Sequence, residues 1–220
     1  MEPISRKYLF FDLDGTLTDS MPGIARAVQY ALRRFGIDVQ DLAALKPFLG
    51  PPLRDSFMEF YGMSPEEADR AVAVSREYFV PRGMFENELY PGIPELLAAT
   101  AAAGRVNVIA TSKPQPFAER IAAHFGIDRH FRLISGSTFD GRRKTKADVI
   151  RHALSALGIA PGEAVMIGDR RHDVEGAAEE GLPAIAVEWG YAPPGELEAA
   201  RPLRIVPDVE TLRRLLLKNE

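Results

Sequence analysis

From Tyr90 to the end of the chain, short apolar runs alternate with segments of helical pattern, and this alternation constrains the fold more than any other feature. The runs predict strands at 105–111, 131–135, 164–168, 184–187 and 204–206. The segments between them predict helices at 93–103, 114–125, 145–157, 173–180 and from about 208 onward. Strands that alternate with helices form a parallel sheet with helices on both faces. We therefore predict a Rossmann-like α/β fold, to which the apolar run 8–11 adds a further strand.

Residues 18–85 show no such alternation and are predicted to be helical throughout. Asp19 or Ser20 is suited to cap the first helix, and a short helix is expected at 53–61. The sequence Ser64-Pro65-Glu66-Glu67 is a capping box that opens a third helix. We expect an α/β core formed by residues 1–17 and 86–220, interrupted by an all-helical domain of residues 18–85.

The composition excludes several functional classes. The formal net charge of −4 argues against general nucleic-acid binding, which needs a basic surface. The chain has no cysteine, so disulfides, thiolate catalysis and Cys-ligated zinc are excluded. The N-terminus offers no secretory signal and no stretch has the ~20 apolar residues of a membrane span. A cytoplasmic location is therefore expected.

Polar residues follow four of the predicted elements at the same edge of the sheet. In an open parallel sheet, ligands bind at the carboxyl ends of the strands. The residues expected there are Asp12 and Asp14 after 8–11, Thr111 and Ser112 after 105–110, Lys146 at the start of 145–157, and Asp169 and Asp173 after 164–168. Carboxylates, hydroxyls and an ammonium group from separate segments should thus meet at one site.

This set of groups predicts phosphoryl-transfer chemistry. Clustered carboxylates repel one another unless a cation lies among them, and oxygen ligands without His or Cys favour Mg²⁺. A carboxylate such as Asp12 can act as a nucleophile and form an acyl phosphate. Lys146 and the hydroxyl of Thr111 can neutralise and bind the phosphoryl oxygens. Asp14, two residues beyond Asp12, is placed to protonate the leaving oxygen and later to activate water.

Four segments resemble, in the expected order, the motifs of the haloacid dehalogenase superfamily, and of its phosphoglycolate-phosphatase-like subfamily in particular. They are FFDLDGT (10–16), VIAT (108–111), the lysine of TKADVI (145–150) and MIGDRRHD (166–173). The resemblance covers essentially the whole chain and implies a Rossmann-like core with a mobile helical cap at 18–85.

The resemblance implies roles for individual residues. Asp12 would be the nucleophile and a Mg²⁺ ligand, and Asp14 the general acid and base and a ligand through its backbone carbonyl. Thr111 and Lys146 would bind the phosphoryl group. Asp169 would bind the metal, and Asp173 would bind it or its waters. The implied substrate is a small phosphorylated metabolite, with phosphoglycolate first.

Several alternatives stay open for the function. A 5′-nucleotidase or a pyrophosphatase has the same chemistry, and so has a sugar phosphomutase, which returns the phosphate to another hydroxyl. A signalling receiver domain is shorter and has no insert, and a catalytically silent scaffold would not need the complete set of reactive groups. The sequence does not distinguish a monomer from a homodimer.

Other residues have competing interpretations. Ser112 competes with Thr111 as hydroxyl donor, and Lys144 competes with Lys146. Arg54, after the Gly-Pro-Pro turn at 50–52, is a candidate for substrate selection by the cap. The remaining candidates are predicted to face solvent or to pack rather than to react, namely Arg170, Arg171, His172 and Trp189.

Overall fold

The computed structural model describes residues 4–217, and these form two compact units. One unit joins Met1–Thr18 to Leu89–Glu220, and the other, here called the inserted unit, is Asp19–Glu88. The boundaries fall within two short paired strands, β2 (Thr18–Asp19) and β3 (Glu88–Leu89). The expectation that residues 18–85 are wholly helical missed this strand pair, because two residues are too few to show a periodic pattern.

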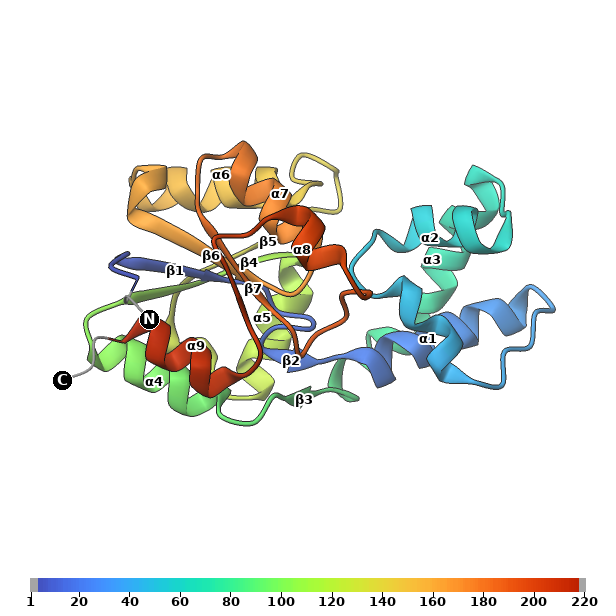
Figure 1. Cartoon of the computed structure of the whole chain (residues 1–220). Coiled ribbons are helices and arrows are strands. Elements are labelled where there is room, and N and C mark those ends of the chain that lie inside the picture. The colour runs from blue at the N-terminus through green and yellow to red at the C-terminus, as the bar shows by residue number, and fades with distance from the viewer. Residues whose placement is uncertain (1–3, 218–220) are drawn as a thin grey trace. The chain divides into compact units, whose positions relative to one another are not determined.

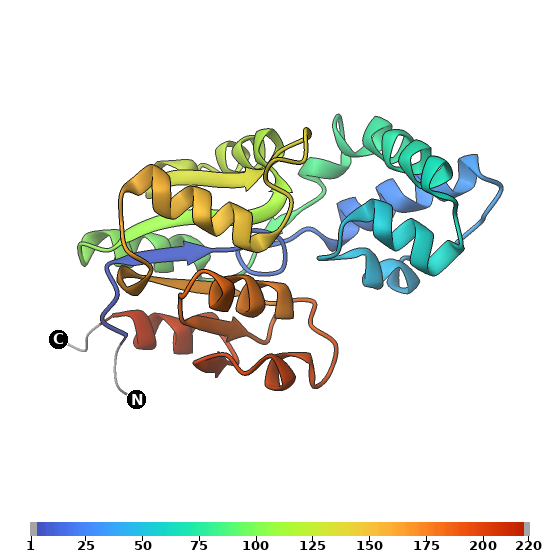
Figure 2. The ribbon, with the colours of Figure 1, turned by 90° about the horizontal axis from the view of Figure 1, so that it is seen from above.

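The larger unit is built on a six-stranded parallel sheet in the order β5-β4-β1-β6-β7-β8. β1 lies between β4 and β6, and Phe10 is in register with Val108 on one side and with Met166 on the other. Figure 2 shows the blue strand β1 beside the green strand β4, with yellow β5 beyond it. The strands are β1 (Tyr8–Phe11), β4 (Val106–Pro114), β5 (Phe131–Ser137), β6 (Ala164–Gly168), β7 (Ala184–Val187) and β8 (Arg204–Val206).

Helices cover both faces of this sheet, which confirms the predicted α/β fold (Figure 1). On one face lie α6 (Lys146–Leu157) and α7 (Arg171–Glu179), and α8 (Glu196–Ala200) packs beside α7. On the other lie α4 (Ile93–Ala102), α5 (Gln115–His124) and α9 (Val209–Leu216). Short 3₁₀ turns occupy Asp128–His130 and Pro161–Glu163.

A buried apolar core lies between the sheet and the helices α6 and α7. Phe10, Val108 and Met166 from three neighbouring strands are fully buried against Val149 and Ile150 of α6. Each such side chain contributes about 1.5–3 kcal/mol by burial. This packing holds the ends of β1, β4 and β6 in one rigid row.

The inserted unit has a core of its own. It comprises α1 (Met21–Arg34), α2 (Leu53–Tyr61) and α3 (Pro65–Phe79), with 3₁₀ turns at Leu42–Phe48 and Gly83–Phe85. The predicted capping box of α3 is present, since Ser64 and Glu67 each accept a backbone N–H of the other. At α1 it is Asp19, rather than Ser20, whose side chain accepts a bond, from the Met21 N–H. No helix within residues 4–217 combines the length and the apolar character that crossing a bilayer requires.

One backbone crossing inside this unit leaves no room for a side chain. A Cβ atom on Gly23 would lie 1.8 Å from the carbonyl oxygen of Gly83, and one on Gly83 would lie 2.8 Å from that of Gly23. Gly23 also donates its N–H to Glu86 O at 3.0 Å. The two segments therefore meet backbone to backbone.

We expect Gly23→Ala to lower the free energy of unfolding by about 1–3 kcal/mol or more, because the new methyl group overpacks this crossing. Urea denaturation followed by circular dichroism measures the change. Gly162→Ala is the matched control, since a Cβ atom there meets nothing within 4 Å. Equal stabilities for the two variants would contradict the interpretation of the crossing.

Candidate active site

The ends of β1, β4 and β6 and the first turns of α6 and α7 bring the predicted residues together. Asp12 follows β1 and continues its ladder, with its N–H bonded to Ile167 O at 2.9 Å. Asp169 follows β6, and Asp173 lies in the first turn of α7. One carboxylate oxygen from each of these three residues lies within 4.8 Å of the others. The expectation that separate segments converge on one edge is therefore met by the geometry.

Lys146 is the cation of this cluster. Its Nζ lies 2.9 Å from Asp12 Oδ1 and 2.7 Å from Asp173 Oδ1, and it donates to Ala110 O at 3.0 Å. Its side chain is 3% exposed, whereas the competing Lys144 is exposed. Thr145 and Asp148 form a capping box that starts α6 at Lys146 and so fixes the backbone position of this lysine.

The two hydroxyl candidates differ in what they contact. The Thr111 hydroxyl hydrogen-bonds to Asp12 and also accepts the N–H of Lys113 at 3.2 Å. Ser112 is half-buried on the neighbouring position of β4, where the strand alternates its side chains between faces. Thr111 rather than Ser112 is thus the hydroxyl beside the carboxylates.

The burial of these groups shifts their acidity. Burial raises the pKa of Asp12 to about 6, with Lys146 opposing the shift and Asp173 adding to it. Burial, followed by repulsion from Asp173 and Asp12, raises the pKa of Asp169 well above its usual range. Burial alone would lower the pKa of Lys146, but Asp12 and Asp173 outweigh it and raise that pKa. The site therefore holds more negative charge than its one central ammonium can neutralise.

The same groups fit a divalent cation. Asp12 Oδ1 and Asp173 Oδ1 are buried, and beyond their ion pairs with Lys146 they receive no hydrogen bond from the described part of the chain. The donors are carboxylate oxygens without His or Cys, which suits Mg²⁺. Counting the carboxylates of Asp12, Asp169 and Asp173 against the ammonium of Lys146 leaves two negative charges, which one such ion would balance.

Two glycine residues, Gly15 and Gly190, pack closely against the side chain of Asp169. A Cβ atom on Gly15 would lie 2.2 Å from Asp169 Oδ2, and one on Gly190 would lie 2.3 Å from Asp169 Cβ. The carboxylate itself accepts the Thr16 hydroxyl at 3.2 Å and the Tyr191 N–H at 2.8 Å. Asp169 is therefore held by loops after both β1 and β7.

The structure gives further roles to residues that the sequence assigned to packing or solvent. Trp189 donates its indole N–H to Thr16 O at 3.1 Å, so it also ties the loop after β7 to the loop after β1. The prediction that Arg170 faces solvent is wrong, because it pairs with Glu196 at 2.8 Å and both side chains are 12% exposed. Asp173 combines its place in the cluster with capping, since its Oδ2 accepts the Arg170 N–H.

Lys113 is a functional candidate that the sequence analysis missed. Its Nζ lies 2.7 Å and 2.6 Å from the two carboxylate oxygens of Asp14. Its closeness to Thr111 in the sequence was the available signal, but β4 is irregular between Thr111 and Pro114, so strand alternation alone does not place Lys113.

Two predicted residues lie outside this cluster. His172 is half-buried and faces Glu175, 4.0 Å away on the same helix. Arg54 belongs to the inserted unit and pairs there with Asp69 at 2.8 Å. Its selection of substrates stays a prediction.

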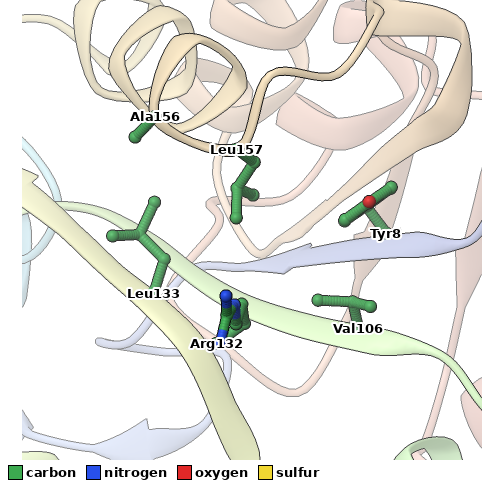
Figure 3. Close-up of a pocket in the computed structure, with 6 residues that line it drawn as sticks. All are labelled: Tyr8, Val106, Arg132, Leu133, Ala156 and Leu157. Carbon is green, nitrogen blue, oxygen red and sulfur yellow. The ribbon is translucent and has the colours of Figure 1, made fainter.

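A hollow of about 410 Å³ lies at the opposite edge of the sheet (Figure 3). It is lined by the first residues of β1, β4 and β5 and by the end of α6, namely Tyr8, Val106, Arg132, Leu133, Ala156 and Leu157. Its only ionisable lining groups are Tyr8 and Arg132, so it has none of the carboxylates that the chemistry needs.

Fold and site together define a Rossmann-like α/β protein with an acidic centre at the carboxyl ends of its strands. Residues 9–187 match the family model described as haloacid dehalogenase-like hydrolase, and the chain belongs to that family. This confirms the resemblance carried by the four motifs.

Individual relatives support the same enzyme class. A 5′-nucleotidase of Pseudomonas aeruginosa is 48% identical over 208 residues, which are 94% of either chain. A predicted phosphatase from Clostridium acetobutylicum superposes with a TM-score of 0.92 at 46% identity, covering 95% of this chain and 97% of that one. The tyrosine-protein kinase PtkA of Mycobacterium tuberculosis is 42% identical over 187 residues, 85% of this chain and 64% of that protein. The predicted enzyme class, a phosphatase, is confirmed by the family match, the nucleotidase and the phosphatase structure, whereas PtkA is a relative named for kinase activity.

We expect Mg²⁺ to raise the melting temperature more at about pH 7.5 than at about pH 5. Without the ion, the raised pKa of Asp12 means that the folded state keeps a proton between its ordinary value of 3.8 and about 6, which the unfolded state has released. Stability therefore falls as the pH rises through that window, and the cation restores it. Differential scanning fluorimetry measures both shifts, with Na⁺ at equal ionic strength as the control. A larger shift at the lower pH would contradict the account.

Gly190→Ala should weaken Mg²⁺ binding by about 10–100-fold, because the methyl group displaces the Asp169 carboxylate. Isothermal titration with the metal alone gives the dissociation constant. Gly162→Ala again serves as the control. An unchanged constant for Gly190→Ala would remove Asp169 from the metal site.

Proposed function

We propose that this hydrolase is a Mg²⁺-dependent phosphomonoesterase with Asp12 as its nucleophile, and that it acts on nucleoside 5′-monophosphates. The observation that carries the proposal is the meeting of Asp12, Asp169 and Asp173 within 4.8 Å, with Lys146 in contact with two of them. A buried, partly neutralised carboxylate next to a cation site is a group that can attack phosphorus.

The first half of the reaction transfers the phosphoryl group to the protein. A carboxylate oxygen of Asp12 bonds to phosphorus while the ester P–O bond breaks, and the departing oxygen takes a proton from Asp14. Thr111 and Lys146 lie beside Asp12 and can hold the phosphoryl oxygens. A Mg²⁺ ion held by Asp12 and Asp169, with Asp173 binding it or its waters and Asp14 contributing its backbone carbonyl, would supply charge neutralisation on the transferred group.

The second half returns the enzyme to its starting state. Asp14, now a carboxylate, takes a proton from water as the water oxygen bonds to the phosphorus of the aspartyl phosphate. The bond between phosphorus and Asp12 breaks, inorganic phosphate leaves, and Asp12 is again a carboxylate. The proton count closes, because Asp14 gives one proton and regains one.

The substrate class rests on the relatives. The nucleotidase is 48% identical to this chain, whereas a phosphoglycolate phosphatase of Yersinia pestis is 32% identical over 190 residues. Nucleoside monophosphates therefore take precedence over phosphoglycolate, and a pyrophosphatase or phosphomutase outcome follows behind. We propose that the inserted unit acts as the cap that selects among these substrates and that Arg54 contributes to it. Action in the cytoplasm, as monomer or homodimer, stays a prediction.

We expect Asp12→Asn to reduce release of phosphate from nucleoside 5′-monophosphates by at least about 10³-fold, since the amide cannot accept phosphorus. A substrate panel that also contains phosphoglycolate, pyrophosphate and a hexose phosphate ranks the substrates, and product analysis separates phosphate release from isomer formation. Borohydride added during turnover should reduce Asp12 of the wild type to homoserine.

Circular dichroism and the melting temperature of Asp12→Asn show whether the variant is folded. Chelation of the metal should abolish wild-type turnover, and Mg²⁺ should restore it. A folded Asp12→Asn variant that keeps its rate would exclude the proposed nucleophile.

A further inference from the structure

Lys113 is a buried lysine whose ammonium faces one carboxylate of the site. It contacts both oxygens of Asp14 at 2.7 and 2.6 Å, and the two side chains are 5% and 19% exposed. A lysine is rarely buried this far unless it is paired, because desolvating its charge is costly. The contact with Asp14 thus accounts for why a lysine is tolerated here.

An irregularity in the pairing of β4 with β5 lies at the position of Lys113. Thr111 pairs with Gly136 of β5, and the next pair joins Pro114 to Ser137, so three steps on β4 match one step on β5. Such bulges change the direction of side chains and are frequent beside active sites. The Lys113 N–H donates a hydrogen bond to the Thr111 hydroxyl, which itself hydrogen-bonds to Asp12. The bulge is thereby connected to the nucleophile.

Gly136 is what allows the two strands to approach at the bulge. A Cβ atom on Gly136 would lie 2.6 Å from Gln115 Cα and 2.7 Å from Lys113 O. Any larger residue would push this part of β4 away. The position of Lys113 is therefore fixed by backbone packing and not only by its ion pair.

We propose that Lys113 is a positioning residue that holds the Asp14 carboxylate in the one orientation from which it gives and takes a proton. The inference rests on the proposed function, because it assigns Lys113 a part in the two proton transfers of Asp14. Asp12 and Asp14 are then served by different lysines, Lys146 for the nucleophile and Lys113 for the acid and base. Removal of Lys113 should impair the proton transfers and spare the attack by Asp12.

The test compares Lys113→Met with two substrates. With 4-nitrophenyl phosphate, the leaving group needs no proton, so the first step should proceed while hydrolysis of the aspartyl phosphate slows. Stopped-flow absorbance should show a burst of about one nitrophenolate per active site, followed by turnover lowered about 10²-fold. With a nucleoside monophosphate, kcat should fall by a similar or larger factor without a burst, and KM should stay within about threefold. Lys113→Arg should partly restore the rate.

Lys144→Met is the matched control, since Lys144 is an exposed lysine of the same region. Equal rates for Lys113→Met and Lys144→Met would overturn the proposal. So would a rise in KM at unchanged kcat, which would make Lys113 a substrate ligand, or a uniform loss of both steps. Failure of the proposed function would look different, as a wild type without turnover or an active Asp12→Asn.

Discussion

Repulsion among buried carboxylates is the constraint on which the rest of this site depends. Two like charges 4 Å apart repel by about 4 kcal/mol at an effective dielectric constant of 20. Asp12, Asp169 and Asp173 lie at about this separation, and Lys146 alone cannot compensate all three. Burial is the main cause of the raised pKa values of Asp12 and Asp169, and the repulsion adds to both shifts. The fit to a divalent cation follows from the same imbalance. The same surplus, once neutralised, gives a site suited to a transferred phosphoryl group.

The loops around this charge are shaped by close backbone approach. A methyl group on Gly15 or Gly190 would overlap the Asp169 side chain, and one on Gly136 would overlap the end of the strand that carries Lys113. Glycine lowers the stability of the folded state because it loses more conformational entropy on folding than other residues. At these positions glycine nevertheless allows segments from different parts of the chain to approach closely. Other contacts tie the loops together, namely the half-buried ion pair of Arg170 with Glu196 and the hydrogen bond from Trp189 to Thr16.

Much of this arrangement could be predicted from the sequence, because it depends on local patterns. Apolar strands and their ends indicated Asp12, Thr111 and Asp169, and the start of the predicted helix at 145–157 indicated Lys146. The prediction ended β4 at residue 111, since Ser112, Lys113 and Pro114 resemble a turn, and the extension to Pro114 that exposes the role of Lys113 depends on pairing with β5. Arg170 and Trp189 likewise contact loops that are distant in the sequence, and the periodicity of apolar residues does not predict such contacts.

The place of β1 in the sheet has a consequence for how the chain acquires its structure. This strand is synthesised before β4 and β6, yet it lies between them, and Phe10 pairs with Val108 of β4 and Met166 of β6. Contacts so distant along the chain form slowly, while the inserted unit has a core that can assemble earlier. A nascent chain that stops before β6 leaves one side of the apolar run Tyr8–Phe11 without a neighbour. Unpaired strand edges of that kind associate with other chains, so aggregation is the characteristic fault of incomplete synthesis.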